Sequence, residues 1–109
     1  MNFLMALAVV GAIAVTPTSG PAPFEPSIII TVTGTFDGSA CAYIDALDTP
    51  EHDEMEFCLP VSVNNDTAAV QLELISSIPG DYTITGHLHS ITGEIIELNT
   101  VAVTIQKAN

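Results

Sequence analysis

Basic side chains are almost missing from this chain of 109 residues. Lys107 is its one basic residue against 13 acidic ones, so the formal net charge at pH 7 is -12. Such a charge repels nucleic acid phosphates and anionic lipid headgroups. The sequence therefore predicts that nucleic acid is not a partner. Residues 1–15, which carry no charged side chain, are the only segment that we expect to contact a membrane.

Motifs of catalysis are also lacking. The sequence contains no G-x-S-x-G elbow, no phosphate-binding loop and no Ser-His-Asp order. A pair of catalytic carboxylates would need a cleft that one small domain rarely forms. The sequence therefore predicts a protein that is not an enzyme and that has no cofactor.

The N-terminal segment is apolar but short. The run from Phe3 to Val15 falls below the length of about 20 residues that spans a bilayer as a helix. It suits either a secretory signal peptide, cut after Ala14 in an A-x-A pattern, or a retained tail that packs against a neighbouring subunit. The apolar residues that such an assembly segment would use are Phe3, Leu4, Leu7, Val9, Val10, Ile13 and Val15. Residues 16–26, with four prolines, are typical of an extended linker.

The remainder, residues 27–109, shows the alternation of apolar and polar residues that is typical of strands. In "SIIITVTGTF" one face carries Ile28, Ile30 and Val32, and in "MEFCLPVSV" one face carries Met55, Phe57 and Leu59. The alternation changes phase in "EIIELNTVAVTIQ", which predicts a bulge near residues 99 and 100. Six or seven short strands with turns between them predict an all-β domain, an antiparallel β-sandwich.

A resemblance supports this fold. The segment "SIPGDYTITGHLHSITGEIIELNTVAVTI", residues 77–105, resembles the end of bacterial and archaeal immunoglobulin-like surface domains, in which a Pro-Gly-x-Tyr-Thr segment begins a strand. The resemblance covers about a quarter of the chain. It implies an immunoglobulin-like sandwich and a tyrosine corner at Tyr82, whose hydroxyl would bond to the preceding loop. It also implies roles such as spacer, adhesin or assembly subunit, and no catalytic residue.

Only two cysteines occur, Cys41 and Cys58, at the ends of the acidic segment "CAYIDALDTPEHDEMEFC". A C-x-x-C redox motif is missing, and a structural zinc site would need further ligands at ordinary spacing. If the two cysteines lie on consecutive strands, a disulfide would close the base of a long hairpin. Such a disulfide is typical of small exported domains, so we expect an extracellular or cell-surface location.

Three further groups of residues could bind ligands or sugars. Carboxylates in the acidic segment are weak candidates for a calcium site, because the glycine-containing register of an EF-hand is missing; these candidates are Asp45, Asp48, Glu51 and Asp53. Solvated loop charges are the favoured interpretation. His87 and His89 would project from one face of a strand toward copper or zinc, but two ligands rarely suffice, so surface histidines are favoured. Asn65 begins an N-glycosylation sequon, "NDT".

The leading functional hypothesis is a structural subunit of an extracellular assembly, such as a pilus-like or thread-like filament. Its apolar N-terminal segment would pack against copies of itself or against other surface subunits. The alternative is a secreted or membrane-tethered immunoglobulin-like binding module with a cleaved signal peptide, which could bind calcium through its acidic loop.

Overall fold

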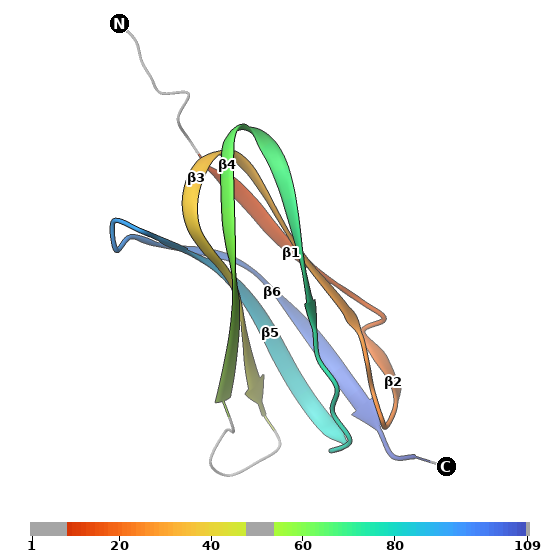
Figure 1. Ribbon diagram of the computed structural model, residues 1–109. Coiled ribbons are helices and arrows are strands. Elements are labelled where there is room, and N and C mark those ends of the chain that lie inside the picture. Colours follow the sequence, from red (N-terminus) through yellow and green to blue (C-terminus); the bar gives the residue numbers. More distant parts are fainter. Residues whose placement is uncertain (1–8, 48–53, 109) are drawn as a thin grey trace, which may run out of the picture.

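A long bent hairpin organises the fold. The structure is a computed structural model that describes residues 9–47 and 54–108. β3 (Ser27–Ala46) and β4 (Glu54–Glu73) pair antiparallel over nearly their whole length, with a register shift between Gly34 and Phe36 (Figure 1). Gly34 and Asn65, which lie near this shift, have φ angles of 125° and 51°. Glycine adopts such angles at low cost, so the hairpin bends where the sequence permits it.

The remaining strands extend the sheet from the other edge of β3. β1 (Val10–Thr16) pairs with the first half of β3, and β5 (Gly80–Ser90) pairs with the second half, both antiparallel. β6 (Ile95–Gln106) follows β5, and the short β2 (Ser19–Pro21) runs parallel to β6. The strand order is β1-β3-β5-β6-β2, with β4 against β3. The protein is thus all-β, as predicted, and its six described strands form one curled sheet.

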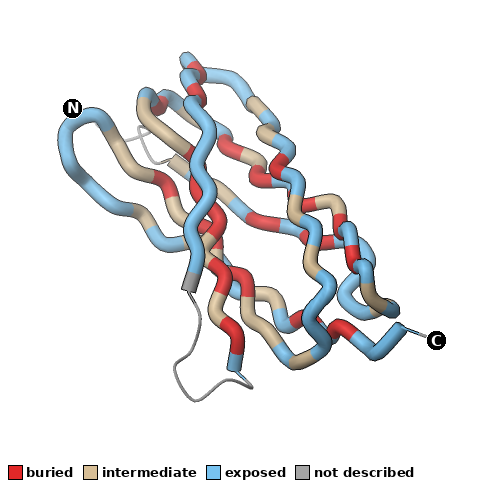
Figure 2. Tube along the Cα trace, turned by 60° about the horizontal axis from the view of Figure 1, so that its bottom comes forward, coloured by how far each residue is buried: buried red, intermediate tan, exposed pale blue. Residues whose placement is uncertain are grey.

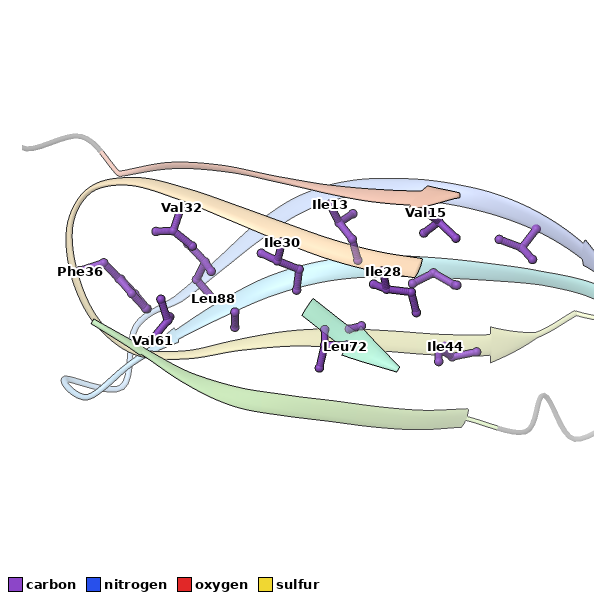
Figure 3. Close-up of a cluster of buried hydrophobic side chains, with 14 of the residues drawn as sticks. Ile13, Val15, Ile28, Ile30, Val32, Phe36, Ile44, Val61, Leu72 and Leu88 are labelled. Carbon is purple, nitrogen blue, oxygen red and sulfur yellow. The ribbon is translucent and has the colours of Figure 1, made fainter. Parts of the chain in front are cut away.

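The curl buries one face of β1, β3, β5 and β6 and part of one face of β4. Side chains from β1, β3, β5 and β6 meet inside it, and buried and exposed positions alternate along the strands (Figures 2 and 3). The largest fully buried side chains are Ile28, Ile30, Ile84, Leu88, Val32 and Cys41. All of them except Cys41 face the curled interior, so the period-two pattern identifies the core face correctly.

The N-terminal boundaries differ from the predicted ones. The predicted tail, residues 1–15, includes β1, in which Ile13 and Val15 are only 3% and 7% exposed. The predicted linker includes β2 and the buried Phe24, which bridges to Ser76. The domain therefore begins at least as early as Val10, because the alternation in "VGAIAVT" continues the core face onto a further strand. Cleavage after Ala14 would remove most of β1.

The predicted bulge is present, and Asn99 within it is hydrogen-bonded to β1. The pairing of β5 with β6 shifts between Thr85 and His87, opposite Thr100 and Glu97. The shift turns the Asn99 amide toward β1, where its Oδ1 accepts from the Ile13 N–H and its Nδ2 donates to the Ile13 carbonyl, both at 2.9 Å. The amide thereby satisfies both backbone groups of Ile13 and closes the gap between β1 and β6.

Candidate functional site

The first half of β4 combines two surfaces of opposite character. On the inner side of the sheet, Met55, Phe57 and Leu59 stand opposite Ile44, Ala42 and Ala40 of β3. They face the core direction, yet they are 52%, 36% and 39% exposed. A small apolar hollow of about 30 Å³ between Met55, Leu74, Phe24 and the core continues this surface inward. We call Met55, Phe57 and Leu59 the apolar stripe.

The apolar stripe is exposed because β4 is an edge strand. Within the part of the chain that the structure describes, β4 pairs only with β3. Its outer backbone groups are therefore available to a further strand, and edges of this kind are the usual points of contact with other chains. Pro60 lacks an N–H group and interrupts this capacity at one position. An added strand would thus pair most regularly on one side of Pro60.

The opposite face of the same strands carries the disulfide. Cys41 and Cys58 are directly paired across β3 and β4, with a Cα–Cα distance of 4.1 Å, and they form the predicted disulfide. His87 of β5 stands opposite Cys41, so Cys58, Cys41 and His87 form one row across three strands. A disulfide is typical of proteins in oxidising compartments, which agrees with the expectation of export.

A carboxylate and two imidazoles meet beside this row. Glu56 Oε2 lies 3.3 Å from His87 Nε2 and 3.5 Å from His89 Nε2. The two imidazole rings pack edge to face with centroids 5.6 Å apart, and the Tyr43 ring lies 5.9 Å from the His87 ring. The side chains of Glu56 and His89 are each 39% exposed, and that of His87 is 16% exposed. We call Glu56, His87 and His89 the histidine–glutamate cluster.

The other predicted ligand residues are only partly covered by the structure. Asp45 lies half-buried near the end of β3. The remaining calcium candidates, Asp48, Glu51 and Asp53, lie outside the described residues. Asn65 is exposed at the bend of β4, and its backbone N–H donates to Thr35 Oγ1 at 3.0 Å. The position is accessible to a glycan.

The predicted assembly segment is divided between the domain and the undescribed terminus. Phe3, Leu4 and Leu7 lie outside the described residues. Ile13 and Val15 belong to the core, so they cannot at the same time contact a neighbour. Val10, 64% exposed, and the half-buried Val9 remain accessible.

One contact of β4 does not follow from the sequence pattern. Glu56 lies on β4 on the same face as Cys58, as the alternation in "MEFCLPVSV" predicts, and it contacts both histidines. The signal was the spacing of Glu56 from Cys58: once the disulfide fixes the register, Glu56 falls on the cysteine face. Its approach to β5 also requires that β3 lie between β4 and β5, which local alternation does not reveal.

No protein-family model and no curated protein sequence matches the chain. Solved structures that are similar in fold include an enzyme and a C-terminal domain. The Pseudomonas fluorescens alkylpurine DNA glycosylase AlkC, bound to DNA containing an abasic site analog, matches with a TM-score of 0.68 and 14% identity over 90% of this chain. The C-terminal domain of wzt matches with a TM-score of 0.56 and 14% identity, covering 91% of this chain and 72% of that one.

The likeness to the glycosylase corrects one prediction. The chain spans 30% of the length of that enzyme. A fold of this kind therefore occurs within an enzyme, which contradicts the prediction, made from the small sandwich and the missing motifs, that the protein is not an enzyme. At 14% identity the likeness concerns the fold alone.

The described residues contain no helix that could span a membrane.

Proposed function

We propose that the chain is an immunoglobulin-like subunit of an extracellular assembly, in which the apolar N-terminal residues of one copy add as a strand to the β4 edge of the next copy. The observation that carries this proposal is the apolar stripe on β4, which pairs with β3 alone among the residues that the structure describes. An added strand would supply hydrogen bonds to the edge and side chains to cover Met55, Phe57 and Leu59.

The immunoglobulin-like assignment is supported by Tyr82. Its hydroxyl donates to the Ile78 carbonyl at 2.7 Å, four residues earlier in the chain. This is the contact of a tyrosine corner, at the position that the sequence resemblance assigns. The Cys41–Cys58 disulfide supports a location outside the reducing cytoplasm.

Residues 1–8 are a suitable occupant for the edge. No charged side chain occurs before Glu25, whereas the rest of the chain carries all 13 acidic residues. The N-terminal residues can therefore approach another copy without adding negative charge to it. Eight residues in an extended strand reach about 26 Å, enough to pair along one side of Pro60.

The contact would join two different surfaces, the N-terminal residues of one copy and β4 of another. A contact of this heterologous type leaves both surfaces open at the ends of the assembly, so it produces filaments unless the rotation closes a ring. The net charge of -12 opposes binding to DNA phosphates, so we do not extend the glycosylase's ligand to this chain.

Light scattering after gel filtration and electron microscopy test the proposal on the full chain. We expect a concentration-dependent series of oligomers that lengthens with added salt, because salt screens the repulsion between acidic copies. Phe57→Gln on the apolar stripe and deletion of residues 2–8 should each give monomers. The matched control is Ile91→Gln, which changes a side chain that is 74% exposed but lies in the turn after β5, outside the apolar stripe. Monodisperse monomers of the full chain, or oligomers that persist in Phe57→Gln, would overturn the proposal.

A further inference from the structure

We propose that the histidine–glutamate cluster binds a divalent transition-metal ion of the Zn²⁺ and Cu²⁺ class, with His87 and His89 as nitrogen ligands and Glu56 as an oxygen ligand. The sequence alone offered two imidazoles, which is too few for a site. The structure adds a carboxylate from another strand, and one oxygen of that carboxylate lies next to both Nε2 atoms. Two imidazoles and one carboxylate form a common ligand set for such ions, with water at the open position.

The carboxylate oxygen lies close enough to each imidazole to share an ion with it. When ligands lie about 2.0–2.1 Å from a tetrahedral metal, neighbouring ligand atoms are about 3.3–3.4 Å apart. Glu56 Oε2 is 3.3 Å from one Nε2 and 3.5 Å from the other. The two imidazole nitrogens do not lie close enough together to hold one ion as they stand, so the exposed Glu56 and His89 side chains would rotate to bring all three atoms around it.

The sheet holds the ligands in place. Both histidines project from β5, and the Tyr43 ring packs against that of His87. On β4, Glu56 is two residues from Cys58, whose disulfide joins β4 to β3. Preorganised ligands lose little conformational entropy on binding, so a site with three protein ligands on one rigid sheet can have useful affinity.

The surroundings favour a cation. Glu97 of β6 stands opposite His87 in the strand register, on the side away from Glu56, so acidic residues occur on the strands to both sides of that histidine. Lys107 is the one permanent cation of a chain with 13 acidic residues, and it follows the end of β6. The negative potential raises the local concentration of divalent ions. The imidazole nitrogens then select transition metals over calcium, which prefers oxygen ligands.

Calorimetric titration of the full, disulfide-bonded chain with Zn²⁺ and with Cu²⁺ tests the site. The disulfide must stay intact because free thiolates would bind both metals. We expect one ion per chain, with Cu²⁺ bound more tightly than Zn²⁺, and no displacement by excess calcium at matched ionic strength. We expect the affinity for the metal to fall by at least about tenfold in each of three variants, His87→Gln, His89→Gln and Glu56→Gln. Removing even a hydrogen-bond partner of a metal ligand costs about this much, so removing a ligand should cost no less. Thermal melts establish that each variant is folded.

Two controls separate a site from diffuse charge. Glu73→Gln removes the same charge from the other end of β4, where it pairs with Ser27, and should leave affinity unchanged. His52→Gln removes the remaining histidine and should also have no effect. Electron paramagnetic resonance of the Cu²⁺ form should show two coordinated nitrogens in the wild-type chain and one in His89→Gln. Equal losses in Glu56→Gln and Glu73→Gln, an equal loss in His52→Gln, or fewer than two nitrogens would overturn the assignment.

Discussion

Replacing Ile13 by alanine tests whether the N-terminal strand belongs to the domain. Ile13 is 3% exposed and pairs with Ile30, which is fully buried. It also packs closely on β5, because a Cβ built on Gly86 would lie 3.0 Å from the Ile13 Cβ. A residue of a mobile tail would have none of these contacts.

The structure sets the size of the expected effect. The substitution removes three buried carbons, which corresponds to about 2.4 kcal/mol at roughly 0.8 kcal/mol each. The cavity that remains adds to this, since Gly86 has no side chain to fill it, and buried Ile→Ala changes generally cost about 2–5 kcal/mol. For a domain of this size, a loss of about 3 kcal/mol lowers the melting temperature by roughly 10–25 °C.

Thermal and urea unfolding, followed by far-ultraviolet circular dichroism, measure the effect. Val10→Ala on the same strand is the matched control; Val10 is 64% exposed, so we expect a loss below about 0.5 kcal/mol. Ile13→Val, with an expected cost of about 0.5–1.5 kcal/mol, keeps the test informative if the alanine variant does not fold. Ile13→Ala and Val10→Ala variants of equal stability would refute the placement of β1 and restore the predicted tail.

Two further predictions concern the disulfide-bonded hairpin and the Tyr82 hydroxyl. Replacing both Cys41 and Cys58 by alanine should lower the free energy of unfolding by about 3 kcal/mol, the chain-entropy estimate for the sequence separation of 17, while the far-ultraviolet spectrum stays that of a β protein; an unfolded variant would contradict this. Tyr82→Phe removes the hydrogen bond to the Ile78 carbonyl and should cost about 1 kcal/mol in urea unfolding, whereas an unchanged midpoint would show that the hydroxyl contributes nothing.

Local alternation predicted the strands well because a half-buried strand has a period that the sequence displays directly. Ile28, Ile30 and Val32 all lie on the core face, and the phase change near Asn99 marks a real bulge. The N-terminal boundary was harder. "MNFLMALAVVGAIAV" is apolar throughout, so the alternation that places Ile13 and Val15 inward is masked by alanines that face outward without being charged.

The histidine–glutamate cluster shows what the pattern within a single strand cannot predict. His87 and His89 are on one face by the period of the strand, and that was predicted. Glu56 joins them because β4 and β5 flank the same strand, β3, a fact of topology. Sequence patterns report which way a residue faces within its own strand, but the neighbours of that strand depend on the whole chain.

The apolar stripe shows the same limit of sequence patterns, and here the limit bears on function. Met55, Phe57 and Leu59 alternate as regularly as any buried residues, and the direction in which they face follows from that alternation. Alternation does not show whether another strand covers these side chains, because such a strand would have to pair with the outer edge of β4. The structure describes no such strand among residues 9–47 and 54–108. Apolar side chains that face the core direction but lie on an unpaired edge strand are suited to being covered by a strand of another chain. This is why we look for the covering strand in a second copy of the protein.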